Sequence, residues 1–325
     1  MRVPSSLGWF IMAAGLLVAS VPAAAQQDYP KQPIKVIASS GPGGLSDIFI
    51  RAVGDELQRR WGQPLIVDNR PGGSNNIAGR ACADAKPDGY TICIIPESVF
   101  LYNPYMFKTM PFDPEKGLTP ISHLFDILQV IVVNASLKVK TLEELAELSK
   151  KQKGTLSYIA PAIGQDIVFE TLIKETGADL VRVPFRGGGE AVTALMTGTT
   201  PIASLGLGNV IGHLKGGKMV AIAIHGHQRS PLFPDVPTLR EIGYKGDFSN
   251  STFGLWAPAG TPPEIIDKLH REIRDIAMAP DFKQKRLIDR GLTPQFLSPA
   301  ETRTWLDELR PITDRIAKTS SMVPR

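Results

Sequence analysis

Residues 34–47 read Ile34-Lys35-Val36-Ile37-Ala38-Ser39-Ser40-Gly41-Pro42-Gly43-Gly44-Leu45-Ser46-Asp47, and this stretch decides the fold. It begins with the apolar, β-branched pattern of a buried strand and continues into a glycine loop directly before the helical run 48–61. The first N–H groups of a helix have no partner within it, and the helix dipole places positive charge there. The stretch therefore predicts a strand, a loop and a helix whose start binds an anion.

Strand-like and helix-like segments alternate along most of the remaining chain. Strands are expected at 64–68, 90–95, 129–133, 156–159 and 180–185, and helices at 75–85, 141–151, 167–176 and 190–196. Three helices are expected to begin at capping boxes, namely Thr141 to Glu144, Thr261 to Glu264 and Ser298 to Glu301. This alternation predicts an α/β fold with mainly parallel sheets flanked by helices.

The N-terminus has the pattern of a secretory signal peptide. Arg2 is followed by the apolar run 7–21 and by Ala23-Ala24-Ala25-Gln26, so cleavage is expected after Ala25. A membrane anchor is the alternative, but the run is shorter than the roughly 18 to 20 residues that a span needs. We therefore expect a soluble mature chain that lies outside the cytoplasm and has room for two ordinary domains.

Composition excludes one class of partner and leaves one question of covalent structure open. The net charge of +4 is spread along the chain, without a basic stripe and interleaved aromatics, so nucleic acid is not an expected partner. The two cysteines are Cys82, in a helical pattern, and Cys93, in the strand that follows. A disulfide and a pair of free thiols are both compatible with this spacing.

The residue patterns of common enzyme sites are missing from the sequence. The run 206–212 is one residue too long for a dinucleotide-binding glycine motif, and no glycine loop is followed by a phosphate-binding lysine. A hydrolase elbow is absent too. His225-Gly226-His227 offers two imidazoles but no third metal ligand at a recognisable spacing. The sequence therefore predicts no catalytic residues, no cofactor and no metal.

Two further loops repeat the order of the first. The segment 158–167 again has a strand, a loop and an Asp-Ile pair at a helix start, and a third loop leads into the helix at Glu190. Asp47 and Asp166 are interpreted as helix-stabilising acids, worth about 0.3 to 1 kcal/mol each. Arg186, in the third loop, is either a bidentate carboxylate ligand or one half of a surface ion pair.

Six motifs in order resemble the Bug family, the periplasmic solute receptors of tripartite tricarboxylate transporters. They are Gly41 to Asp47, Val67 to Gly73, Lys86 to Thr91, Val183 to Gly188, Arg229 to Thr238 and Ala257 to Pro262. The resemblance covers essentially the whole mature chain. It implies a two-lobed periplasmic binding protein of the Venus-flytrap, type II-like class, with lobe 1 formed by 26–126 plus 249–325 and lobe 2 by 127–248. It also implies a monomer that catalyses no reaction and delivers a small organic carboxylate to membrane permease subunits.

The resemblance also implies the ligand-binding residues, because family members hold the carboxylate mainly with backbone amides from a glycine loop in each lobe. The first loop is represented here by Gly43, Gly44, Leu45, Ser46 and Asp47. The second is represented by Ala160, Pro161, Ala162, Gly164, Gln165 and Asp166, and the candidate set is completed by Ser40, Arg186, Gly187 and Thr252.

Departures from the family pattern concern the ligand. Asp166 stands where many members have His, and Pro161 removes one N–H donor from the second loop. Ser40 and Thr252 replace aromatic residues, which leaves room for a bulkier acid or adds hydroxyl contacts. If Asp166 is ionised in the cleft, it repels a second carboxylate and accepts a hydrogen bond from a ligand amine or hydroxyl. A receptor that signals rather than transports, and an enzyme acting on an anion, are the alternative functions.

Overall fold

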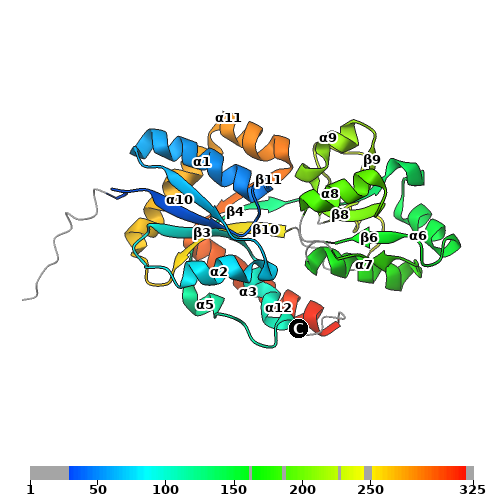
Figure 1. The fold of residues 1–325 in the computed structure, drawn as a ribbon, viewed down its shortest axis with the longest axis horizontal. Helices are drawn as coiled ribbons and strands as arrows, with labels where there is room; N and C mark the ends of the chain where they lie inside the picture. The colour runs from blue at the N-terminus through cyan, green and yellow to red at the C-terminus, as the bar shows by residue number, and fades with distance from the viewer. Residues whose placement is uncertain (1–28, 161–162, 185–187, 226–227, 245–250, 320–325) are drawn as a thin grey trace, which may run out of the picture.

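The computed structural model describes residues 29–160, 163–184, 188–225, 228–244 and 251–319, and it contains two sheets side by side (Figure 1). The first sheet has the strand order β11-β4-β10-β3-β1-β2 and the second has the order β7-β6-β8-β5-β9. The first comprises β1 (Ile34–Ala38), β2 (Leu65–Asn69), β3 (Thr91–Pro96), β4 (Leu118–Ile127), β10 (Ser251–Pro258) and β11 (Leu292–Leu297). The second comprises β5 (Gln129–Asn134), β6 (Ser157–Ile159), β7 (Val181–Arg182), β8 (Ile202–Gly206) and β9 (Met219–Ile224).

Helices cover both faces of each sheet. Over the first sheet lie α1 (Leu45–Trp61), α10 (Pro263–Met278) and α11 (Pro280–Phe282) on one face, and α2 (Asn76–Ala83), α3 (Ser98–Leu101), α5 (Pro114–Gly117) and α12 (Pro299–Thr319) on the other (Figure 1). The second sheet carries α6 (Leu142–Lys151) and α7 (Ile163–Thr176) on one face, and α8 (Gly188–Thr197) and α9 (Ile211–Lys215) on the other. Short helical segments are α4 (Asn103–Met106), η2 (Gly73–Asn75), η3 (Ala135–Leu137), η4 (Leu207–Asn209), η5 (Lys283–Leu287) and η6 (Ile288–Arg290).

Four apolar clusters, one on each face of each sheet, form the core. Under α1 and α10, the first sheet buries a cluster that includes Phe49 and Phe125, whose ring centroids are 4.9 Å apart. On its other face, Phe100 stacks on Trp256 at 4.1 Å. The predicted α/β class is confirmed, since alternating strands and helices bury two sheets on both faces.

The sheets are mixed, however, and not mainly parallel as predicted. Parallel pairs join β1 to β2 and β3, and join β6 to β7 and β8. The other strand pairs of the two sheets in the described residues are antiparallel, and they involve β4, β5 and β10. The chain leaves the first sheet through β4, enters the second through β5 after Leu128 alone, and returns to the first as β10. Strands used for such crossings are not joined by a β-α-β connection, so they are free to run antiparallel.

Two of the three predicted capping boxes are confirmed at the helix starts. The Thr141 hydroxyl accepts the Glu144 N–H at 3.1 Å, and the Ser298 hydroxyl accepts the Glu301 N–H at 3.3 Å. The third prediction is wrong, because the Thr261 hydroxyl donates to the carbonyl of Pro258 at 2.7 Å and α10 begins after Pro262 without a side-chain cap. Proline at the first helical positions lacks the N–H that a cap would satisfy.

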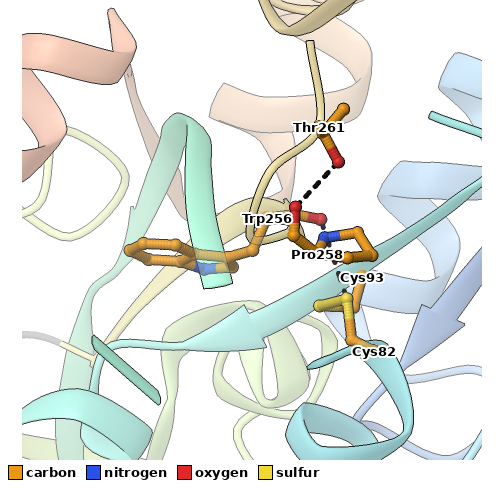
Figure 2. Close-up of a disulfide and its surroundings, with 5 residues drawn as sticks. All are labelled: Cys82, Cys93, Trp256, Pro258 and Thr261. Carbon is orange, nitrogen blue, oxygen red and sulfur yellow. Dashed lines mark hydrogen bonds between the residues drawn. A yellow bond between two sulfur atoms is a disulfide. The ribbon is translucent and has the colours of Figure 1, made fainter. Parts of the chain in front are cut away.

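Cys82 and Cys93 form a disulfide that joins α2 to β3 beneath β10 (Figure 2). Their Cα atoms are 6.0 Å apart, which is within the range for a disulfide, and both residues are fully buried. The Cys82 sulfur also lies 3.9 Å from the Trp256 carbonyl oxygen. A disulfide sulfur has no proton to donate, so we interpret this approach as packing.

Reduction of the disulfide is expected to lower the free energy of unfolding by about 3 kcal/mol, because opening a loop this short returns conformational entropy to the unfolded chain. Urea denaturation of the mature protein with and without a thiol reductant measures the difference. The double variant Cys82→Ala/Cys93→Ala serves as the control, since its stability should not respond to the reductant. Equal stability of the oxidised and reduced wild-type protein would contradict the prediction.

Candidate functional site

The glycine loop after β1 is closed by hydrogen bonds within itself. The Gly43 N–H donates to Oδ2 of Asp47 at 2.9 Å, and the Gly44 N–H donates to the Gly41 carbonyl at 3.2 Å. Both N–H groups are therefore used within the loop in this structure, and the prediction that they contact a ligand remains a prediction. The N–H groups of Leu45, Ser46 and Asp47, the first three of α1, have no acceptor within the part of the chain that the structure describes. The donors available to an anion thus begin one residue later than Gly44.

Asp47 is the residue that holds this loop in shape. Besides the bond from the Gly43 N–H, its carboxylate accepts a hydrogen bond from Nε of Arg51 at 3.0 Å and another from Nδ2 of Asn69 at 2.8 Å. Asn69, the last residue of β2, also donates to the Ser40 carbonyl at 2.9 Å. Burial alone would raise the pKa of Asp47, but the hydrogen bonds from Arg51, Asn69 and Gly43 outweigh burial and lower it. Asp47 therefore does more than stabilise the helix dipole.

The start of α1 lies against the second sheet. The Leu45 side chain lies beside Gly206, the last residue of β8, and Gly208 in η4, since an added Cβ would be 3.7 Å from it at Gly206 and 3.0 Å from it at Gly208. The Ser40 Oγ is 2.7 Å from Oγ of Ser46, so the two hydroxyls share a hydrogen bond and one of their two protons remains available. A Cβ on Gly44 would be 3.1 Å from Cβ of Ser40, so a side chain there would require Ser40 to shift by a few tenths of an ångström. The free N–H groups of α1 therefore lie at the junction of the two sheets.

The second predicted loop is described only in part. Pro161, Ala162, Arg186 and Gly187 lie outside the described residues, so their predicted roles remain predictions. Ala160 is buried directly after β6, and Gly164 lies in the first turn of α7. The Gln165 amide is buried and donates to Oε1 of Gln129, at the start of β5. Gln165 thus ties α7 to the strand that crosses between the sheets.

Asp166 is engaged within its own lobe. Its Oδ2 is 2.6 Å from Nε of Arg182 on β7, and its Oδ1 accepts the Tyr158 hydroxyl at 3.2 Å. Burial raises the pKa of Asp166, and the Arg182 and Tyr158 contacts oppose that shift. The hypothesis that this carboxylate is free to repel or bind a ligand is therefore not supported, because its charge is already paired.

A buried acid that the sequence analysis did not single out follows β3. Glu97 is 7% exposed, and its Oε2 accepts both the backbone N–H of Thr252 at 2.8 Å and its hydroxyl at 2.7 Å. The Thr252 hydroxyl, predicted to contact a ligand, is thus used by Glu97. A signal was present in the sequence, since Glu97 comes directly after β3 (Thr91–Pro96), as Ser39 comes directly after β1.

Only one of the two histidines considered as metal ligands lies in the described residues. His225 is buried, its Nε2 is 3.1 Å from Oγ of Ser204, and burial lowers its pKa to about 3. It is therefore neutral and structural. His227 lies outside the described residues. Among the residues that are described, no group of three His, Cys, Asp or Glu side chains has a geometry suited to a metal ion.

The two sheets also touch through their backbones. A Cβ on Gly208 would lie well under 3.0 Å from the Arg290 carbonyl oxygen, and a Cβ on Gly291 would be 3.1 Å from the Gly208 nitrogen. Gly291 has φ +68°, a conformation that side chains rarely adopt. Gly208, within the run 206–212, therefore serves close packing between η4 and η6.

Two helix-flanked mixed sheets, between which the chain passes from β4 to β5 and to which β10 returns it, with a free helix start at their junction, define the class of the two-lobed periplasmic binding proteins. The chain belongs to the tripartite tricarboxylate transporter family receptors, whose family model matches residues 49–321. This confirms the family that the six motifs indicated.

Individual relatives agree with this assignment. Protein BugT from Bordetella pertussis is 32% identical over 313 residues, which cover 95% of this chain and 94% of BugT. The structure of the periplasmic binding protein BugD has a TM-score of 0.83 at 26% identity and covers 91% of this chain and all of its own. Rpa4515 of R. palustris, solved with adipate, has a TM-score of 0.86 at 26% identity and covers 92% of this chain and 100% of its own. MatC from Rhodopseudomonas palustris, solved with bound malate, has a TM-score of 0.80 at 26% identity, covering 89% and 100%.

None of the helices in the described residues combines the length and the apolar character that crossing a membrane requires.

Proposed function

We propose that this protein is a periplasmic receptor that binds a small organic carboxylate between its two lobes and delivers it to a membrane transporter. The observation that carries the proposal is the start of α1, where the N–H groups of Leu45, Ser46 and Asp47 lie at the junction of the sheets without an acceptor among the described residues. Three converging amides at the positive end of a helix 17 residues long suit a carboxylate.

The family and its solved members support the chemical class of the ligand. Rpa4515 and MatC were solved with adipate and malate, both small carboxylates, and the present chain shares their fold. We assign lobe 1 to 26–126 plus 249–325 and lobe 2 to 127–248, and this division is supported by the way the strands separate into two sheets. The signal peptide, the monomeric state and the permease partner are parts of the same proposal.

A thermal-shift screen of the mature protein against mono- and dicarboxylates tests the proposal. An acid present at 100 times its Kd is expected to add about 2.7 kcal/mol to the free energy of unfolding and to raise Tm by several degrees. The matched control for each acid is its neutral amide, which has nearly the same shape but cannot use a positive helix end. The proposal is wrong if no acid raises Tm, or if acids and amides act alike.

A receptor must also return its ligand unchanged. We expect NMR spectra of a bound acid, recorded after prolonged incubation and release by denaturation, to match those of the starting compound. Conversion to a product would support the alternative of an enzyme acting on an anion.

A further inference from the structure

Glu97 carries a buried carboxyl group that links two strands of the first sheet. The residue is 7% exposed and follows β3, and its Oε2 accepts hydrogen bonds from the N–H and the hydroxyl of Thr252 on β10 at 2.8 and 2.7 Å. The carboxyl group also accepts a hydrogen bond from its own backbone N–H. None of these donors is positively charged. A buried carboxylate that is bonded only by neutral donors is costly, so burial favours the protonated form.

Glu97 lies at the edge of the first sheet where the chain passes between the sheets. β4 runs toward this edge and continues as β5 of the second sheet, and β10 begins at the same edge on the return (Figure 1). β10 pairs with β3 in the antiparallel register that sets Phe253 opposite Pro96, so Glu97 stands opposite Thr252, the second residue of β10. The Glu97–Thr252 contact therefore fastens one of the two crossing strands to the first sheet.

The second sheet and its helices help to cover this edge. Ile167, near the start of α7, packs against the apolar cluster that contains Ile95 and Val99, which stand two residues before and after Glu97. If the two lobes separate, this contact is lost and water approaches the end of β3. Access to water lowers the cost of a charge on Glu97 and favours the ionised form.

The nearest charge from a neighbouring strand is negative. Asp126 on β4 stands opposite Thr252 in the register of β10 with β4, so the two acids lie on either side of Thr252. Asp126 is itself bonded to Nε2 of His123 at 2.8 Å and to the Gln295 amide at 2.7 Å. Repulsion from Asp126 therefore acts in the same direction as burial, toward a protonated Glu97.

The balance of these effects sets the titration of Glu97. Burial first, and then Asp126, raise its pKa from 4.5 to about 7, against the hydrogen bonds from Thr252. From α7, the acid Asp166 is already paired with Arg182. In the arrangement of this structure, the pKa of Glu97 thus lies at neutral pH, whereas access to water would return it toward its ordinary value.

We propose that Glu97 couples the uptake of a proton to closure of the two lobes, being protonated when they close around the ligand and ionised when they open. Glu97 is then a positioning residue, which acts through Thr252 and the crossing strand. The inference rests on the proposed function, because it takes the closed arrangement to be the one that the ligand favours. The protonated form belongs to the closed state, so ligand affinity should rise as the pH falls from about 7 toward about 5 and should level off above pH 7.

Isothermal titration of the mature protein with adipate and with malate tests the inference. Titrations at about pH 6 in buffers of different ionisation enthalpy count the protons taken up on binding. We expect the wild type to take up about one proton more than Glu97→Gln, because glutamine resembles the protonated acid but cannot titrate. Glu308→Gln, at an exposed position of α12, is the matched control and should behave as the wild type. Equal proton uptake by wild type and Glu97→Gln overturns the inference.

The affinity itself should show the same coupling. Between about pH 5.5 and pH 8, we expect the wild type to lose on the order of tenfold or more in affinity relative to Glu97→Gln, whose profile contains only the titration of the ligand and of the other groups. A purely structural role of Glu97 would instead change the affinity by the same factor at every pH, and that result overturns the inference.

The variant Thr252→Val provides a second test that keeps Glu97 in place. Valine has nearly the shape of threonine but lacks the hydroxyl, so it removes a hydrogen bond that favours the ionised form of Glu97. We expect the fall in affinity to occur at a higher pH than in the wild type. An unchanged pH profile would show that Glu97 is not the titrating group.

Small-angle scattering of the ligand-free protein separates this inference from the proposed function. The wild type should become more compact as the pH falls from about 8 to about 5.5, and Glu97→Gln should change less, because its side chain is neutral throughout. An identical response of the two proteins overturns the coupling, whether or not an acid binds. Binding of no acid at all contradicts the proposed function, and the scattering comparison then still decides the role of Glu97.

Discussion

Replacing Gly208 with alanine is expected to weaken ligand binding by a factor of about 5 to 150. The added Cβ would lie well under 3.0 Å from the Arg290 carbonyl oxygen, a distance that real Cβ atoms essentially never show. Both sides of this contact are backbone, so no side chain can rotate to relieve it. Overpacking of this kind costs about 1 to 3 kcal/mol, and the equivalent change in affinity gives the range.

The lobes can avoid the clash only by moving apart. η4 follows β8 of the second sheet, η6 precedes β11 of the first, and Leu45 at the start of α1 lies against the same glycine. A shift here displaces the amides that we assign to the carboxylate. We therefore expect Gly208→Ala to disfavour the relative position of the lobes seen in this structure. If that position is the one that binds the ligand, the affinity falls in proportion to its population.

Gly212→Ala is the matched control, because a Cβ at Gly212 would meet nothing within 4 Å and the residue has no positive φ. Calorimetry with the tightest acid of the screen, and small-angle scattering to compare compactness, measure the two variants side by side. If Gly208→Ala binds that acid as tightly as Gly212→Ala does, the backbone contact does not position the lobes.

The sequence predicted the first strand, loop and helix well, because each is specified by local chemistry. The apolar run of β1 and the glycines before α1 determine their own conformations, and six ordered motifs then indicated the family. The free start of α1 follows from the absence of a capping side chain at Gly44. Such features need no knowledge of the rest of the chain.

The direction of individual N–H groups could not be predicted in the same way. Gly43 donates to Asp47 because Asn69 and Arg51 hold that carboxylate in place, and Asn69 comes from the next strand. Pairing between Asp166 and Arg182 likewise depends on the contact between α7 and β7. The mixed sheets were missed for the same reason, since strand direction depends on where the chain crosses between lobes.

The run 206–212 shows how a motif can be explained without a ligand. Its glycines do not have the spacing of a nucleotide site, and the sequence offered no other reason for them. The structure gives one, because Gly206 packs against Ile127 and Gly208 packs against Arg290, both from the first-sheet side of the molecule. The presence of glycine in such a run is explained by the close approach of two backbones, and no bound phosphate is needed to explain it.

Replacing Asp47 with alanine is expected to lower the free energy of unfolding by about 3 kcal/mol and to weaken binding of every acid. The side chain is buried, and its removal leaves the Gly43 N–H, the Asn69 amide and the Arg51 guanidinium without their acceptor. Ser40 then loses the support of Asn69, so the loop and the first amides of α1 lose their fixed positions. If Asp47 only stabilised the start of the helix through the helix dipole, its replacement would lower the free energy of unfolding by only about 0.3 to 1 kcal/mol.

The dependence on pH distinguishes these two roles further. The folded-state pKa of Asp47 is lowered, so its ionised form contributes stability above the unfolded-state value of 3.8, and this contribution is lost as the pH falls through the folded-state pKa. The stability difference between wild type and Asp47→Ala should thus be full at pH 7 and shrink below about pH 4.

Asp55→Ala, on the exposed side of the same helix, is the control and should change stability by less than about 0.5 kcal/mol at either pH. Urea denaturation at pH 7 and pH 3.5 measures both variants. If Asp47→Ala cost no more than Asp55→Ala at pH 7, Asp47 would not be the residue that holds the glycine loop.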